Sequence, residues 1–204
     1  MVQKKKTVEI DVDGVLADIL GNDYIKNKLK TVYPDWSDSH IKKYDLSDIQ
    51  EKNLEAYRII IRSFHDPNLF RLMPAYSGVV EGMRKLLADN RISIRIHTLI
   101  RGDQEVVDAR RTWIEKFMRT VEPRSELREK MDFKYQIDVG KKVMFENMDY
   151  LIEDCPDNLM ASDAKNKILI KRSYNEDFAL TDKSLIVAKS FYEAARYIID
   201  RIED

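Results

Sequence analysis

The acidic pair Asp11 and Asp13 is the part of this sequence best suited to chemistry. It follows a stretch in which Val8 and Ile10 alternate with polar residues, which is the pattern of a β-strand. Side chains two residues apart on a strand point to the same face, so the two carboxylates can converge on one point. Holding them together is costly unless a cation or a proton lies between them. Gly14 follows, and it permits a tight turn and a close approach of the backbone to a ligand.

The motif D-V-D-G has two other interpretations, a plain turn that ends a strand and a calcium-binding loop. Asp and Gly are common residues in such turns, so the first interpretation stays open when the motif is taken alone. A calcium loop needs a glutamate at a fixed distance, and the six residues after Gly14 are V-L-A-D-I-L. The sequence therefore does not support a calcium loop.

Three further positions carry groups that bind phosphate or cations. The alternating stretch R-I-S-I-R-I-H-T predicts a strand ending in Thr98, whose hydroxyl can donate to a phosphate oxygen. The apolar run Y-L-I predicts a short buried strand that ends in Glu153 and Asp154. Lys142 lies about a dozen residues upstream of that acidic pair, and the spacing does not distinguish it from its neighbour Lys141.

The elements that would position these groups alternate between strand and helix. Helices are predicted over 19–29, 51–64, 76–89, 103–118 and 191–202, and strands over 7–10, 91–98, 150–152, 167–171 and 185–187. Parallel strands with helical crossovers bring their carboxyl ends to one edge of a sheet, where ligands bind in open α/β folds. We therefore expect the acidic, hydroxyl and lysine side chains to share that edge.

A mostly helical segment of about fifty residues separates the first predicted strand from the second. This is long for a simple crossover between parallel strands. We predict that residues 19–72 form a helical cap inserted into a core made of residues 1–18 and 73–204. The alternative is that these helices simply pack on the sheet.

The motif D-V-D-G-V-L-A-D resembles the first motif of the haloacid-dehalogenase-like phosphohydrolases, in the variant of their 5'(3')-deoxyribonucleotidase (5'-nucleotidase type C) branch. The later motifs follow in the family's order. Thr98 matches the second motif, Lys142 the third, and the acidic pair before P-D-N the fourth. The phrases K-K-Y-D-L-S-D, D-P-N-L-F-R-L-M-P and R-S-Y-N resemble the cap, the cap exit and a later loop of such proteins.

The resemblance implies a three-layer, Rossmann-like parallel α/β sheet with a small helical cap after the first strand. It implies a Mg²⁺-dependent phosphatase in which Asp11 is the nucleophile and Asp13 the general acid and base. The implied catalytic residues are Asp11, Asp13, Thr98 and Lys142. The implied substrate-binding residues are Gly14, Thr98, Leu99 and Arg101. The implied metal ligands are Asp11, Asp13 through its backbone carbonyl, and Asp154.

The chain departs from the family pattern at two of these motifs. Leu99 stands where members often have a small residue, and Glu153 stands where they more often have aspartate. We expect Glu153 and Asp157 to act as supporting acids. His97 is expected to be a packed strand histidine, and Arg101 has a solvated loop arginine as its alternative.

The substrate implied by the resemblance is a small phosphate monoester, a (deoxy)ribonucleoside monophosphate. The aromatic residues Tyr44, Phe64 and Phe70 could stack on a base, but a cap core needs such residues too, and none is assigned as a contact. Three alternatives stay open: a sugar phosphate, a nucleic-acid 3'-phosphate, and an inactive nucleotide-binding pseudo-phosphatase.

Composition limits the remaining classes of function. The 204 residues are 44% hydrophobic and 35% charged, with a net charge of -1, which lacks the basic footprint of a nucleic-acid binder. The single cysteine, Cys155, cannot form an internal disulfide and fits a reducing compartment. No apolar run of signal-peptide or membrane-spanning length is found. We expect a cytoplasmic protein with no membrane partner and no stable nucleic-acid partner, and a homodimer is left open.

Overall fold

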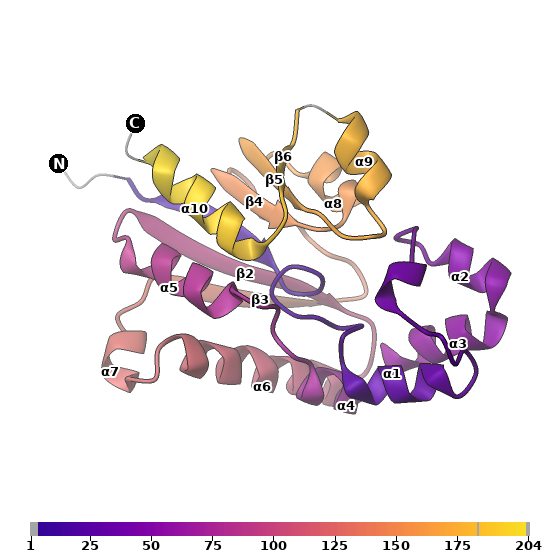
Figure 1. Cartoon of the computed structure of the whole chain (residues 1–204). Helices are drawn as coiled ribbons and strands as arrows, with labels where there is room; N and C mark the ends of the chain where they lie inside the picture. The colour runs from indigo at the N-terminus through magenta and orange to yellow at the C-terminus, as the bar shows by residue number, and fades with distance from the viewer. Residues whose placement is uncertain (1–3, 183, 203–204) are drawn as a thin grey trace.

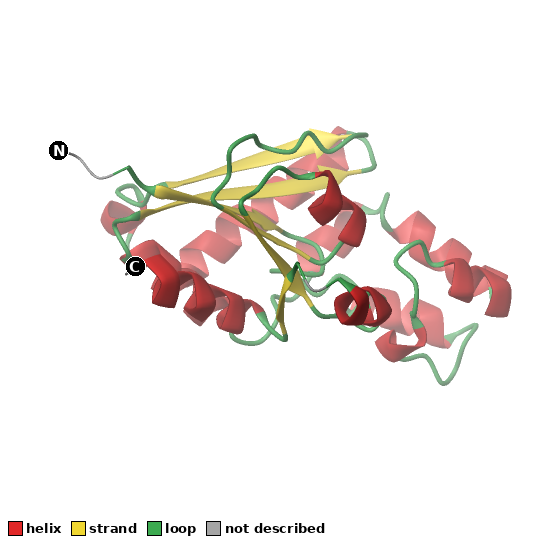
Figure 2. Cartoon of the chain, turned by 90° about the horizontal axis from the view of Figure 1, so that it is seen from above, coloured by secondary structure: helices red, strands yellow, loops and turns green. Residues whose placement is uncertain are grey.

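The centre of the molecule is a twisted parallel β-sheet, shown from two sides in Figure 1 and Figure 2. The computed structural model describes residues 4–182 and 184–202. Within these residues the sheet has six strands in the order β3-β2-β1-β4-β5-β6, and every neighbouring pair is parallel. The strands are β1 (Lys6–Asp11), β2 (Ile92–Ile100), β3 (Phe133–Val139), β4 (Tyr150–Glu153), β5 (Asn166–Ile170) and β6 (Ile186–Ala188).

The helices connect these strands and are bounded by local capping residues. They are α1 (Asp23–Lys30), the 3-10 helix η1 (Asp38–His40), α2 (Ser47–Lys52), α3 (Leu54–Ser63), α4 (Pro67–Leu72), α5 (Val79–Ala88), α6 (Gln104–Val121), α7 (Ser125–Arg128), α8 (Pro156–Ala161), α9 (Glu176–Thr181) and α10 (Phe191–Ile202). The side chain of Asn22 caps α1, and that of Asp103 caps α6. Pro156 opens α8, at a position where its missing N–H costs little. In the described part of the chain, no helix is both long and apolar enough to cross a membrane.

Alternating side chains give the sheet two apolar faces. Ile152 of β4 and Ile168 of β5 belong to the main core, while Leu151 and Leu169 of the same strands belong to a second cluster with Leu159 of α8. Residues of α5, α6 and α10 supply the helical side of the main core, and α8 packs on β4 and β5. Helices thus lie on both sides of the sheet, which confirms the predicted three-layer, Rossmann-like α/β fold.

Strand β1 lies in the middle of the sheet and ends in Asp11. Val8 and Ile10 are fully buried, and Ile10 pairs with Ile96 of β2 on one side and Ile152 of β4 on the other. The end of β1 is therefore held from both sides, with the carboxyl ends of β2 and β4 beside it.

Helices α1 to α4 form a group between β1 and α5, to one side of the sheet (Figure 1). The two chain segments that lead into and out of this group run together. The Asp18 amide donates to the Pro74 carbonyl at 2.8 Å, and the Tyr76 amide donates to the Leu16 carbonyl at 3.0 Å. The last helix of the group, α4, packs against α6.

Several elements differ from the sequence prediction, which did not include α4, α7 or α9. The helix predicted over 51–64 is split into α2 and α3, because Asn53 leaves the helical conformation and caps α3 through the Ala56 amide at 2.9 Å. Strand β2 continues to Ile100, so Thr98 lies inside the strand and not at its end. Strand β3 is absent from the predicted elements. It is an edge strand in which no residue is fully buried, although its residues F-K-Y-Q-I-D-V alternate between apolar and polar.

Candidate active site

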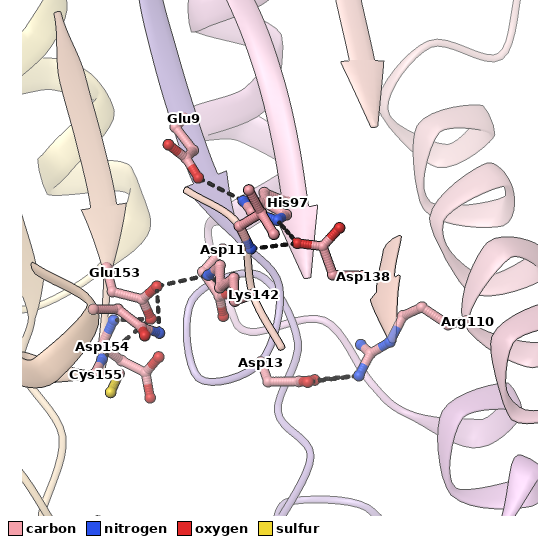
Figure 3. Close-up of polar contacts among 12 residues, drawn as sticks. Glu9, Asp11, Asp13, His97, Arg110, Asp138, Lys142, Glu153, Asp154 and Cys155 are labelled. Atoms are coloured by element: carbon pink, nitrogen blue, oxygen red, sulfur yellow. Dashed lines mark hydrogen bonds and ion pairs between the residues drawn. The ribbon is translucent and has the colours of Figure 1, made fainter. Parts of the chain in front are cut away.

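Three buried carboxylates meet at the carboxyl ends of β1 and β4. Asp11, Glu153 and Asp154 each offer an oxygen, and these oxygens lie within 4.8 Å of one another. Lys142 lies among them: its Nζ donates to Asp11 Oδ1 at 2.6 Å and to Glu153 Oε2 at 2.8 Å (Figure 3). The Lys142 side chain is only 6% exposed, so these charges interact where water screens them weakly.

The surroundings shift the pKa values of these groups in different directions. Burial, reinforced by the Glu153 charge, raises the pKa of Asp11 to about 8. Burial and the charges of Glu153 and Asp11 also raise the pKa of Asp154. Burial acts in the same sense on Glu153, but the Lys142 ammonium outweighs it and lowers the pKa of Glu153. Burial disfavours the charge of Lys142, but Asp11 and Glu153 outweigh it and raise the pKa of Lys142.

The donor set of this acidic cluster fits a hard divalent cation. If all three carboxylates are ionised, they and the one ammonium leave two negative charges in excess, which a divalent cation would balance. Oxygen donors are the ligands that Mg²⁺ prefers. Asp11, Glu153 and Asp154 are the residues that could hold such an ion.

Gly14 brings the backbone against this cluster. Its φ of +76° lies in the left-handed region that glycine adopts without strain. A Cβ atom at this position would come within 2.1 Å of Asp154 Oδ2 and 2.6 Å of the Tyr174 hydroxyl. Glycine is therefore required here by conformation and by space.

Hydrogen bonds from neighbouring side chains orient the two acids that follow β4. The Tyr174 hydroxyl donates to Asp154 Oδ2 at 2.5 Å, and Asn158 Nδ2 donates to Glu153 Oε2 at 3.1 Å. The amides of Asp154 and Cys155 donate to Glu153 Oε1 at 3.1 and 3.2 Å. Glu153 is thus held at the end of β4 by contacts on both of its carboxylate oxygens.

Asp13 lies apart from this cluster, in an ion pair with Arg110 of α6 (Figure 3). Arg110 Nη2 donates to both carboxylate oxygens, at 2.7 and 2.6 Å. Arg110 is fully buried, and its guanidinium carbon lies 4.4 Å from the centre of the Phe70 ring in α4. The pair therefore fixes the Asp13 carboxylate and links it to α4 and α6.

A second buried network supports the loop that carries Lys142. His97 Nδ1 lies 2.6 Å from Glu9 Oε1, and His97 Nε2 lies 2.8 Å from Asp138 Oδ2 (Figure 3). The same oxygen of Asp138 accepts the Val143 amide at 2.6 Å. Burial lowers the pKa of His97, but the hydrogen bonds to Glu9 and Asp138 outweigh it and raise that pKa. A protonated His97 thus ties the sheet to the residue that follows Lys142.

A cavity of about 460 Å³ opens above the acidic cluster, between it and the helices of residues 19–72. Its polar end is formed by Asp11, Asp13, Lys142, Glu153 and Asp154. The other end is formed by apolar and aromatic side chains of the helical segment. With a divalent cation on the acidic cluster, a small ligand with one anionic end and one apolar end would match this division.

The sequence comparisons agree with this geometry. Residues 5–200 match the family model described as "5' nucleotidase, deoxy (Pyrimidine), cytosolic type C protein". The chain belongs to this family. The expected resemblance to the type C branch is thereby confirmed, and the protein is a phosphoric monoester hydrolase of the 5'-nucleotidase type. No curated protein matches the sequence.

Solved structures show the same fold at low sequence identity. A haloacid dehalogenase-like family hydrolase from Streptococcus pneumoniae has a TM-score of 0.56 and 13% identity, over 95% of this chain and 98% of that one. A haloacid-dehalogenase-superfamily hydrolase from Ehrlichia chaffeensis has a TM-score of 0.52 and 14% identity, over 99% of this chain and 100% of that one. The D,D-heptose 1,7-bisphosphate phosphatase from Burkholderia thailandensis has a TM-score of 0.51 and 12% identity, over 97% and 100%. These similarities support the haloacid-dehalogenase-like fold.

Most of the residues expected at the nucleotidase site line the cavity. They are Asp11, Asp13, Gly14, Leu99, Arg101, Lys142, Glu153 and Asp154. Lys142 is buried on the acidic cluster while Lys141 is exposed, so the structure distinguishes the two lysines. Asp157 is exposed and does not line this cavity.

Thr98 is the expected residue that the structure places elsewhere. It is fully buried, its hydroxyl has no hydrogen-bond partner among the described residues, and it does not line the cavity. The cause is that β2 continues past Thr98, so side chains keep alternating between the two faces of the sheet. His97, which pairs with Asp11, and Leu99 lie on one face, and Thr98 lies on the opposite face. The predicted contact of Thr98 with phosphate is not supported by this geometry.

Tyr174 and Arg110 are functional candidates that the sequence did not indicate as such. The only sequence signal for Tyr174 is its place in R-S-Y-N, which resembles a loop of the family. Arg110 belongs to an ordinary amphipathic helix and has no local signal, because its partner Asp13 is 97 residues away.

We expect Tyr174→Phe to weaken divalent-cation binding about tenfold or more, because Asp154 loses the hydrogen bond that orients it. Isothermal titration calorimetry with Mg²⁺ measures this affinity without turnover. Tyr135→Phe, on the exposed edge strand β3, is the matched control and should bind as the native protein does. Equal affinities for both variants would show that the Tyr174 hydroxyl does not orient Asp154.

We expect His97→Gln to cost the most stability near pH 6 and progressively less as the pH rises. The native pKa of His97 is raised, so its contribution is fully present below the unfolded pKa of about 6.5 and is lost as the pH passes the native value. Urea unfolding of both proteins from pH 6 to pH 9, with chelator present, gives the difference in unfolding free energy. His65→Gln, at an exposed position, is the control. A difference independent of pH would contradict a protonated His97.

Proposed function

We propose that the protein hydrolyses (deoxy)ribonucleoside monophosphates through Mg²⁺-dependent transfer of the phosphoryl group to Asp11. The observation that carries this proposal is the position of Asp11. Its carboxylate lies at the polar end of the cavity, beside Lys142 and two further buried acids. Membership of the 5'-nucleotidase family supports the substrate class.

A bound Mg²⁺ would neutralise the acidic cluster and the phosphate dianion together, which lets one anion approach another. Asp11 and Asp154 would hold the ion, together with the backbone carbonyl of Asp13, and Glu153 supports them. Lys142 already contacts Asp11 and Glu153 and supplies a cation for the phosphoryl oxygens. Arg101, which lines the cavity and forms no ion pair among the described residues, supplies another.

The reaction needs two displacements at phosphorus. An Asp11 oxygen forms a bond to phosphorus while the bond to the nucleoside 5'-oxygen breaks, and Asp13, which must be protonated at this stage, gives its proton to that oxygen. A water molecule then attacks the phosphorus of the aspartyl-phosphate. Asp13 takes a proton from the water, and the phosphorus–Asp11 bond breaks to release inorganic phosphate and restore the carboxylate.

Residues 19–72 act in this proposal as a cap over the leaving group. The paired chain segments at Asp18–Pro74 and Leu16–Tyr76 join this cap to the core, and the apolar end of the cavity comes mainly from cap residues. We further propose that the protein works in the cytoplasm on free small-molecule substrates.

Release of inorganic phosphate from deoxyribonucleotides, ribonucleotides, sugar phosphates and a 3'-phosphorylated oligonucleotide tests this function. We expect activity on the nucleoside monophosphates with Mg²⁺ and none with chelator. Asp11→Asn should lower that activity by at least about a thousandfold with the fold intact, because an amide cannot form the intermediate. Asp157→Asn, an exposed control on α8, should be unaffected. Activity confined to sugar phosphates would reject the substrate assignment, and near-normal rates for Asp11→Asn would reject the mechanism.

We expect loss of the Arg110–Asp13 ion pair to lower kcat by up to about a hundredfold, because Asp13 loses its fixed orientation. Arg110→Met removes the cation, and Arg110→Lys keeps it and should retain more activity. The dependence of kcat on pH should change shape in Arg110→Met if Arg110 acts through Asp13. A uniform loss at every pH would indicate a purely structural role.

A further inference from the structure

The apolar end of the cavity is poor in groups that can hydrogen-bond a ligand. Its walls from the cap segment are dominated by Tyr44, Tyr57, Ile60, Ile61, Phe64 and Phe70. Among the described cap residues that line the cavity, none has a side-chain amide, an ammonium, a guanidinium or an aliphatic hydroxyl, and the hydroxyls of Tyr44 and Tyr57 are the uncharged hydrogen-bonding groups of these side chains. The one charged cap residue there, Asp45, is exposed and accepts the Ser47 amide at the start of α2.

Two of these side chains leave apolar surface uncovered. Tyr44 is 50% exposed, with its ring edge-on to Tyr174 at 5.8 Å between centroids, and Ile61 is 36% exposed on α3. Both line the cavity that begins at Asp11 and Lys142. Flat or bulky apolar groups attached to a phosphate are the ligands that would cover this surface.

Recognition by hydrogen bonds and recognition by apolar contact give very different selectivity. A site that hydrogen-bonds a polar edge rejects an analogue without that edge by about 10⁴-fold or more, because its own buried groups lose their partners. An apolar wall distinguishes ligands that differ by one methylene by only about tenfold or somewhat more. Because most of the cap side chains in the cavity are apolar, the cap can favour ligands with a large apolar surface. It can distinguish the hydrogen-bonding edges of different bases only weakly.

We propose that this cavity selects the leaving group by its apolar face and not by hydrogen bonds to a base. The substrate class is phosphate monoesters of primary alcohols that carry a flat or bulky apolar group. Deoxyribonucleotides belong to it with little discrimination among bases, arylmethyl phosphates belong to it equally, and polyhydroxylated sugar phosphates do not. This inference rests on the proposed function for the phosphate end of the site.

A series of monophosphates with primary-alcohol leaving groups tests the proposal, since their leaving groups have similar acidity. The series is the four deoxyribonucleoside 5'-monophosphates, ethyl, hexyl, benzyl and 2-naphthylmethyl phosphate, and glucose 6-phosphate. We expect kcat/KM values for the four nucleotides within about tenfold of one another. We expect 2-naphthylmethyl phosphate to exceed glucose 6-phosphate by at least about a hundredfold, and hexyl phosphate to exceed ethyl phosphate.

A pair of variants on α3 locates the effect in the cap. Ile61→Ser should lower kcat/KM for 2-naphthylmethyl phosphate about tenfold and leave that for ethyl phosphate unchanged. Leu54→Ser is the matched control, because Leu54 is 46% exposed on the same helix but does not line the cavity. Equal losses in both variants, or a loss in Ile61→Ser that extends to ethyl phosphate, would contradict selection by this wall.

The outcomes separate this inference from the proposed function. Hydrolysis of nucleotides with a spread above about a hundredfold among bases would overturn the inference and leave the function standing. Hydrolysis of arylmethyl phosphates without nucleotides would overturn the nucleotide assignment and leave the inference standing. If nothing is hydrolysed, calorimetry with 2-naphthylmethylphosphonate and methylphosphonate makes the same comparison, and equal affinities would overturn the inference.

Discussion

The contact of one buried ammonium with a group of buried carboxylates is the interaction on which the rest of this structure depends. Lys142 pairs with Asp11 and Glu153, and Asp154 lies close enough to share a cation with both acids. Such a group is costly to bury, and one ammonium offsets only part of the cost. The remaining negative charge makes a divalent cation favourable there, so cation binding should stabilise the folded protein as well as enable its chemistry.

The sheet order explains how residues far apart in the sequence reach this point. Because β4 pairs with β1, the acids that end β4 lie beside Asp11. The loop that carries Lys142 follows β3, and the network of Glu9, His97 and Asp138 ties it to β1 and β2. Core strands thus position the carboxylates and Lys142 at one end of the cavity, while the helices of residues 19–72 line the other end. The division of the cavity into a polar and an apolar end is a direct result of this arrangement.

The sequence predicted the parts of this arrangement that are encoded locally. Alternating apolar residues indicated β1, β2 and the acids of β4, and the length of the inserted segment indicated the helical group. Strand β3 was not predicted, although F-K-Y-Q-I-D-V carries the same local alternation of apolar and polar residues. The position of Thr98 depends on where β2 ends. Pairing with β3 extends β2 to Ile100, and the local sequence does not show this pairing. Arg110 and Tyr174 were not predicted as site residues, because only the tertiary fold brings them to their partners Asp13 and Asp154.

The central claim is that the Asp11 carboxylate receives the phosphoryl group, and chemical trapping tests it most directly. Rapid acid quench of the enzyme during turnover, followed by borohydride reduction, converts an aspartyl-phosphate to homoserine at the modified position. Peptide mass spectrometry then identifies that position. The account predicts homoserine at residue 11 when substrate and Mg²⁺ are both present, and unmodified Asp11 when either is omitted. Turnover at normal rate without homoserine at residue 11, or with it at another acid, would contradict the account.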